Sequence, residues 1–204
     1  MVLVGFENIK PVANAGTSQS VEIHTTVTLD GSGSTDANGD ALSYQWSLIS
    51  VPEGSASTIT NPSAKITTFI PDKPGTYVVQ LIVNDGTVGS DPSTVQIQVI
   101  TAETAAILAI QSCETDIASL DPGVFKNSNM QNTLINKLHA VIASIEAGDY
   151  NEALGQLKND ILGKTDGCAK SGEPDKNDWI LECEAQNTVY QCIQNAITEV
   201  EDLL

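Results

Sequence analysis

Hydrophobic and polar residues alternate along short segments in the first hundred residues of the chain. In the clearest segment, Gly75–Asn84, apolar side chains recur at every second position: Tyr77, Val79, Leu81 and Val83. Alternation of this kind lets a β-strand bury one face and expose the other. The same analysis predicts seven short strands: Val21–Ile23, Thr26–Leu29, Leu42–Ser50, Ala56–Ile59, Ile66–Phe69, Gly75–Asn84 and Ser93–Ile100. Strands of this length, separated by turn residues, are typical of a β-sandwich.

The stretch Leu29–Trp46, LDGSGSTDANGDALSYQW, joins an oxygen-rich loop to one of these strands. Gly and Ser predict a tight, irregular loop, and Tyr44 and Trp46 then alternate with polar residues. We expect Trp46 to be the central aromatic residue of the core, with Tyr77 as a second support.

The spacing of apolar residues changes from two to three or four after Thr101–Glu103. This period predicts four helices: Glu103–Leu120, Asn127–Ala147, Tyr150–Leu162 and a last helix that starts after Asp178, with Trp179 and Ile180 at its head, and runs to about Asp202. Asp149 and Glu152 have the spacing of a capping box for the third helix. Short connections between the first three helices favour a compact four-helix bundle.

Four Cys residues lie in this second half, and their even number predicts disulfides formed in an oxidising compartment. The loop Lys164–Asp178 is long for a compact domain and contains Cys168. We prefer the pair Cys168–Cys183, which leaves Cys113–Cys192, although four Cys allow three pairings and the sequence does not decide among them. Cys183 and Cys192 would point to nearly opposite faces of one helix, which disfavours their pairing with each other.

The net charge of the chain is −17, and all nine basic residues are Lys. Nucleic acid and anionic membranes are therefore disfavoured as partners, because both need a basic surface. No apolar run approaches the roughly 20 residues of a membrane span. The segment Met1–Lys10 is too short for a signal peptide and lacks its basic start, so we expect either that a signal was removed or that secretion uses another route. The acidity favours high solubility or the binding of divalent cations.

Three strings in the first half, PVANAG, VTLDGSGSTDANGDALSYQWSL and TTFIPDKPGTYVVQLIVNDG, resemble the polycystic-kidney-disease (PKD) repeat domain. The SLISVPEGSAS insert after the tryptophan is similar to the bacterial PKD-like form. The resemblance covers about residues 10–100 and implies an immunoglobulin-like sandwich that serves as a spacer or adhesion module on secreted and cell-surface proteins. Some members bind calcium, and the corresponding residues here are Asn14, Asp36, Asn38, Asp40 and Asp85. A simple Asx-turn would explain the same loop without calcium.

The string NTLINKLHAVIASIEAGDYNEALGQLKNDI is similar to FIMAH-type helical modules of secreted bacterial proteins. The insertion KTDGC…PDKNDWI departs from that pattern. Four oxygen-bearing residues in or near this insertion are candidates for a second cation site: Asp166, Asp175, Asn177 and Asp178. The alternative is a solvated loop in which Asp178 caps the last helix. The expected fold is thus an all-β immunoglobulin-like sandwich over residues 1–100 and an all-α, disulfide-stapled four-helix bundle over residues 101–204.

The sequence contains no phosphate-binding, dinucleotide-binding, zinc-protease or nucleophile-elbow motif, and its two His lie in different halves. We therefore expect a non-enzymatic secreted or cell-surface module for adhesion, spacing or protein–protein interaction. Its partner would be a protein, an extracellular matrix or a polysaccharide. One alternative is a fibre subunit that self-assembles by strand addition, with the apolar segment VLVGF as the donor strand. An ordinary first strand or a linker explains the same segment, and we prefer that explanation. A further alternative is an accessory region of a larger secreted hydrolase.

Overall fold

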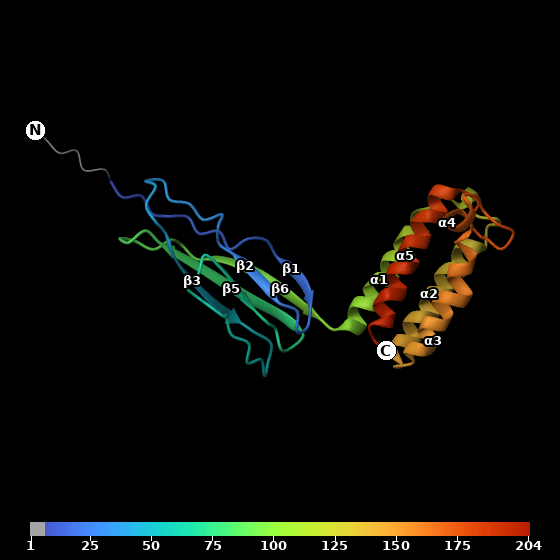
Figure 1. Cartoon of the computed structure of the whole chain (residues 1–204), viewed down its shortest axis with the longest axis horizontal. Coiled ribbons are helices and arrows are strands. Elements are labelled where there is room, and N and C mark those ends of the chain that lie inside the picture. Colours follow the sequence, from blue (N-terminus) through green and yellow to red (C-terminus); the bar gives the residue numbers. More distant parts are fainter. Residues whose placement is uncertain (1–6) are drawn as a thin grey trace, which may run out of the picture. The chain divides into compact units, whose positions relative to one another are not determined.

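The computed structural model describes residues 7–204, and the chain divides into two compact units, with the boundary between Thr101 and Ala102. The first unit contains the strands and the second contains the helices (Figure 1). Each unit buries its own cluster of apolar side chains, so each has a separate hydrophobic core. The segment VLVGF, which we considered as a donor strand, lies outside the described residues.

The first unit contains two β-sheets. The larger sheet has the order β1-β6-β5-β3, formed by β1 (Gln19–Glu22), β6 (Ser93–Ile100), β5 (Gly75–Asn84) and β3 (Ser43–Ser50). β1 runs parallel to β6, and the other pairs are antiparallel. The smaller sheet pairs β2 (Val27–Asp30) with β4 (Ile66–Phe69) in antiparallel register. This two-sheet arrangement is the predicted immunoglobulin-like sandwich.

The alternating residues of β5 supply the centre of the sandwich core, because Tyr77, Val79, Leu81 and Val83 are each 0% exposed. Trp46 on β3 is 2% exposed, and its indole Nε1 donates a hydrogen bond to the Ala64 carbonyl over 3.1 Å. The Tyr77 ring packs 5.6 Å from that of Phe69, and its hydroxyl donates to the Lys73 carbonyl. Both aromatic residues thus have the core positions expected from the sequence, and each polar end is satisfied.

The strand predicted at Ala56–Ile59 is wrong, because this segment is irregular apart from a single bridge between Ile59 and Phe69. Asp72 explains the difference. Its carboxylate accepts hydrogen bonds from the Ser55 hydroxyl (2.6 Å), the Ala56 amide (2.7 Å) and the Ser57 hydroxyl (2.8 Å). These bonds satisfy groups that a strand ladder would otherwise need, so the segment folds around one side chain instead.

The helical unit is built on three long helices: α1 (Ala102–Ser119), α2 (Met130–Glu146) and α5 (Cys183–Glu201). α1 and α5 lie side by side (Figure 1) and are joined by a disulfide. Their apolar stripes share one core with α2 and with α3 (Tyr150–Gly155). On the predicted stripe of α2, Leu134, Leu138, Val141 and Ile145 are buried and Ile142 is partly buried.

The segment Tyr150–Leu162, predicted as the third helix, is not one regular α-helix. α3 continues as the π-helical turn η2 (Gln156–Ile161) and the 3-10 turn η3 (Leu162–Lys164). The predicted capping box is wrong, because the Asp149 side chain makes no cap hydrogen bond. Glu152 instead accepts from the side chain of Gln156, one turn further along, so it does not reach back to the helix start.

The last helix begins later than predicted, at Cys183. The preceding residues, 179–182, are not helical, because their backbone groups bond to distant segments. Trp179 accepts from the Lys126 amide over 2.9 Å and donates to the Lys164 carbonyl over 2.9 Å. Leu181 donates to the Val124 carbonyl over 2.7 Å, next to the bridge between Phe125 and Ile180. Two short elements complete the unit: the 3-10 turn η1 (Pro122–Val124) and α4 (Gly167–Ser171).

Candidate functional site

The loop before β3 holds one carboxylate in a fixed position. Asp36 Oδ1 accepts hydrogen bonds from the amides of Asn38 (2.8 Å) and Asp40 (3.1 Å), as expected of an Asx-turn. Asp36 Oδ2 is buried and has no hydrogen-bond partner among residues 7–204. A buried carboxylate oxygen without a partner is costly, and a bound cation would satisfy it.

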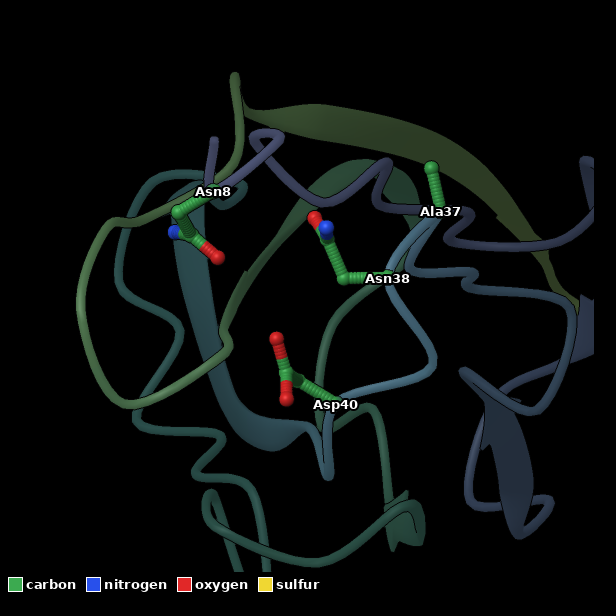
Figure 2. Close-up of a pocket in the computed structure, with 4 residues that line it drawn as sticks. All are labelled: Asn8, Ala37, Asn38 and Asp40. Carbon is green, nitrogen blue, oxygen red and sulfur yellow. The ribbon is translucent and has the colours of Figure 1, made fainter. Parts of the chain in front are cut away.

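A hollow of about 550 Å³ lies beside this loop and is lined by Asn8, Ala37, Asn38 and Asp40. Figure 2 shows the polar side chains of Asn8, Asn38 and Asp40 around one opening. Asn38 also ties the N-terminal segment to the loop, because its Oδ1 accepts from the Ile9 amide and its Nδ2 donates to the Glu7 carbonyl. Asn8 was missed by the sequence analysis, since nothing near it forms a motif.

Asp85 and Asn14, the other two residues of the expected calcium set, have their side-chain oxygens engaged by the protein. Asp85 Oδ1 accepts from the amides of Thr87 and Val88, and its Oδ2 accepts from Asn8 Nδ2 over 2.8 Å. These bonds, led by that from Val88, lower the pKa of Asp85. The Asn14 side chain accepts from the Gly16 amide.

The structure therefore separates the residues that were expected to bind calcium together. Asn38 and Asp40 line one hollow, and Asp85 is linked to it through Asn8. Asn14 lines a different hollow, which also contains Asp30 and Ser32.

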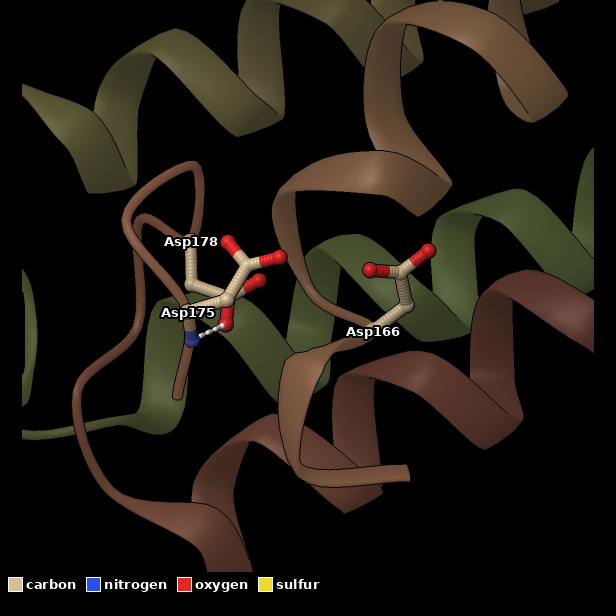
Figure 3. Close-up of side chains that lie close together, drawn as sticks. All are labelled: Asp166, Asp175 and Asp178. Carbon is tan, nitrogen blue, oxygen red and sulfur yellow. Dashed lines mark hydrogen bonds between the residues drawn. The ribbon is translucent and has the colours of Figure 1, made fainter. Parts of the chain in front are cut away.

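Three carboxylates of the helical unit converge at the long loop. Oxygens of Asp166, Asp175 and Asp178 all lie within 4.8 Å of one another. Figure 3 shows Asp175 and Asp178 close together on the loop, with Asp166 approaching from the turn before α4. Asp178 is 0% exposed and Asp166 4% exposed, whereas Asp175 is exposed. We call these three residues the acidic cluster.

Hydrogen bonds within the loop hold the acidic cluster in place. Asp178 accepts from the amides of Asp175 and Gly167, and Asp175 accepts from the Asn177 amide over 2.6 Å. Lys170 forms an ion pair with Asp166, which raises the pKa of Lys170. The alternative in which Asp178 is a solvated helix cap is wrong, because it is fully buried and the N-cap of α5 is Glu182.

The helical unit has two disulfides, and both are the pairs preferred from the sequence: Cys113–Cys192, which joins α1 to α5, and Cys168–Cys183, which joins the long loop to the start of α5. The buried Gln186 on α5 adds a tie that the sequence analysis missed. Its Oε1 accepts from the Cys168 amide and its Nε2 donates to the Ile180 carbonyl over 3.1 Å. Only burial distinguishes it from other helical Gln residues.

The two His residues occupy unrelated positions. His24 lies in the turn after β1 and has a positive φ of 68°. The ring of His139 on α2 is 59% exposed and lies 3.3 Å from Glu114 Oε1 on α1. Both positions are explained by local structure. Among the described residues, no helix is long and apolar enough to cross a membrane.

Comparisons with known proteins assign the first unit. Residues 15–99 match the family model described as "K319L-like, PKD domain". The PKD domain of the KIAA 1837 protein is 28% identical, with a TM-score of 0.38, and the match covers 48% of this chain and 93% of that chain. The PKD domain of human KIAA0319 is 19% identical, with a TM-score of 0.39, and the match covers 50% of this chain and 91% of that chain.

A nucleoside hydrolase-related hypothetical protein from Saccharophagus degradans, associated with carbohydrate metabolism, is 27% identical, with a TM-score of 0.40. That match covers 46% of this chain and only 26% of the other protein. No curated protein matches the chain. The resemblance of the helical unit to FIMAH-type modules stays a prediction. Residues 15–99 of this chain are a PKD-like domain.

Proposed function

We propose that this chain is a non-enzymatic interaction module of a secreted or cell-surface protein, and that calcium stabilises it. The observation that carries the proposal is the match of residues 15–99 to a PKD domain. The two disulfides support an oxidising, extracellular location. In this view the PKD-like unit is a spacer or adhesion domain, and the helical unit is a disulfide-stapled four-helix bundle that presents a surface to a protein, matrix or polysaccharide partner.

The donor atoms support calcium as the ligand at two places. In the first unit, the unpartnered Asp36 Oδ2 lies in the loop that leads to Asp40, and calcium prefers carboxylate and amide oxygens. In the helical unit, the acidic cluster brings three carboxylates within 4.8 Å, with Lys170 as the one cation paired to them among the described residues. Like charges this close repel, and a divalent cation would offset the repulsion.

Thermal unfolding in calcium and in chelator tests this proposal for each unit separately. Trp46 reports on the first unit and Trp179 on the second, so Trp→Phe backgrounds separate the two transitions. Calcium should raise both melting temperatures, since a ligand at 100 times its Kd stabilises by about 2.7 kcal/mol. Asp36→Asn should abolish the rise only in the first unit, and Asp175→Asn only in the second.

Glu53→Gln is the matched control, because Glu53 is exposed and lies in neither site. It should keep both increases in melting temperature. If neither transition moves at about 10 mM calcium, roughly tenfold above the weakest affinities of extracellular modules, the calcium proposal fails.

A second candidate function is assembly into a fibre by strand addition, and the position of β3 at the end of its sheet favours it. The Trp46 amide of β3 already donates to the Pro62 carbonyl over 2.8 Å, so an added strand would pair with the other outward groups of this edge. β3 ends the four-stranded sheet, and its sequence SYQWSLIS contains no charged residue. Uncharged edge strands are prone to pair with another chain. Ile49 on this strand is 52% exposed, so Ile49→Lys places a charge at the edge. A fibre subunit should form large particles in size-exclusion light scattering that disappear in this variant and on deletion of residues 1–9.

A region appended to a secreted hydrolase would instead bind an insoluble polysaccharide or protein substrate in a pull-down. If the protein stays monomeric and binds no such substrate, the interaction module is the interpretation that remains.

A further inference from the structure

The helical unit has a groove that is separate from the acidic cluster. It has a volume of about 340 Å³ and lies between the end of α1, η1 and the first turns of α5. Its apolar lining is formed by Leu120, Val124 and Ala185, and its acidic lining by Asp121, Glu182 and Glu184. We call it the α1–α5 groove.

The apolar residues form the floor of the α1–α5 groove and the acidic residues form its rim. Val124 and Ala185 are each 8% exposed, and Leu120 is partly buried. Asp121, Glu182 and Glu184 are exposed. Leu181, which precedes Glu182 in the chain, is 48% exposed and adds apolar surface next to the rim.

The rim carboxylates have unused charge. Within residues 7–204, none of the three forms an ion pair, and the side chains of Glu182 and Glu184 make no hydrogen bond. Asp121 uses one oxygen to accept from the Gly123 amide. No residue that lines the groove is basic. Glu182 is the N-cap residue of α5, and Glu184 lies in its first turn.

The spacing of the carboxylates argues against a metal ion in the groove. Among the described residues, Asp166, Asp175 and Asp178 form the group of acidic side chains close enough to hold a metal ion, and the rim residues do not belong to it. A wider cation with an apolar stem would fit better than a compact ion. The guanidinium group of arginine is planar, carries five donors and bridges separated carboxylates, and its aliphatic stem packs on apolar surface.

We propose that the α1–α5 groove binds an arginine side chain of a partner protein. The stem would lie on Val124 and Ala185, and the guanidinium would bridge Glu182 and Glu184. The chain itself contains no Arg, so a second copy cannot supply this group. The proposal rests on the proposed function only in taking the chain as an interaction module.

The groove is held open by covalent and backbone ties on both sides. The Cys168–Cys183 disulfide fixes the start of α5, and Cys113–Cys192 joins α5 to α1. The Leu181 amide donates to the Val124 carbonyl over 2.7 Å, which ties η1 to the residues that precede α5. Such pre-organisation lowers the entropy cost of binding.

Titration of the full chain with a short arginine-containing peptide, followed by amide NMR shifts, tests the proposal. All samples contain chelator, so the result does not depend on calcium. Resonances of Val124, Ala185 and Thr188 should shift. A peptide with citrulline in place of arginine keeps the shape but loses the charge, and should bind about tenfold more weakly.

Three variants complete the test. Glu182→Gln with Glu184→Gln should weaken binding by about tenfold. Glu53→Gln with Glu146→Gln removes the same charge from exposed positions elsewhere and should leave binding unchanged. Thr188→Arg places an arginine at the groove itself and should exclude the peptide, while a normal NMR spectrum shows that the variant folds.

The proposal is overturned if the control variant weakens binding equally, since the attraction would then be general electrostatics. It is also overturned if the citrulline or a lysine peptide binds as well as arginine, or if the shifts map elsewhere. None of these results would bear on the calcium-dependent melting that tests the proposed function.

Discussion

Removing the two disulfides one at a time should destabilise the helical unit by different amounts. Cys113 and Cys192 are 79 residues apart in sequence, whereas Cys168 and Cys183 are 15 apart. A cross-link stabilises mainly by limiting the unfolded chain, and a longer loop limits it more. In the chain-entropy model the long loop contributes about 4.5 kcal/mol near room temperature and the short loop about 3 kcal/mol.

The variants are Cys113→Ala with Cys192→Ala, and Cys168→Ala with Cys183→Ala. Guanidinium unfolding followed by helical circular dichroism gives the free energy of unfolding of the helical unit. Trp46 fluorescence, in a Trp179→Phe background, follows the first unit as an internal control. Its transition should not move, because no Cys lies before residue 102.

The reasoning is refuted if the short-loop variant loses as much stability as the long-loop variant. It is also refuted if the Trp46 transition shifts with either, because the two units would then unfold as one. Reduction of the wild type should reproduce the loss in the helical unit alone.

Three further predictions concern single residues. Trp46→Ala should cost the first unit about 3–5 kcal/mol of unfolding free energy, since a buried aromatic side chain is removed; chemical denaturation measures it, and a loss below about 1 kcal/mol would contradict the core position. Hydrogen bonds, led by that from the Ser55 hydroxyl, lower the pKa of Asp72, so its stabilising contribution is present above the ordinary carboxyl range and is lost as pH falls below about 4. Melting temperatures of the first unit between neutral and acid pH should therefore fall less steeply in Asp72→Asn than in the wild type, and equal slopes would exclude this role. Gly167→Ala should disrupt the acidic cluster, because the added Cβ would lie 2.6 Å from the Asp175 amide nitrogen and closer still to Asp178 Oδ2. In the control variant Gly163→Ala the added Cβ meets open space, so this variant should fold normally. We expect only Gly167→Ala to lose the calcium-dependent rise in melting temperature, at unchanged helical content.

Sequence reasoning located the regular elements well, and the reason is local. The bounds of β5 and β6 equal those predicted, since alternation along one strand reports directly which face is buried. The stripe on α2 succeeds for the same reason, with the helical period in place of two. The preference for one disulfide pairing depended on the predicted positions of the helices, and the other pairings stayed open until the fold was known.

The elements that sequence reasoning misplaced are those whose backbone is satisfied from far away. Ala56 belongs to no strand because its amide donates to the Asp72 carboxylate, and Trp179 lies outside the last helix because Lys126 and Lys164 complete its hydrogen bonds. The secondary-structure propensity of neighbouring residues does not indicate such distant hydrogen-bond partners. The capping box at Asp149 matched the motif, yet the Glu152 side chain bonds to Gln156 instead.

The same distinction between local sequence and distant contacts applies to the candidate sites. The sequence by itself determined which groups are available: an excess of carboxylates, no Arg, two tryptophans and a PKD-like loop rich in oxygen atoms. Only the tertiary structure decided which of them meet. It set Asn8 beside Asp40, placed Asn14 in another hollow, buried Asp178 against Gly167 and opened the α1–α5 groove. The physical reason is that charge and hydrogen-bonding capacity belong to each residue, whereas distance and burial belong to the packing of segments far apart in sequence.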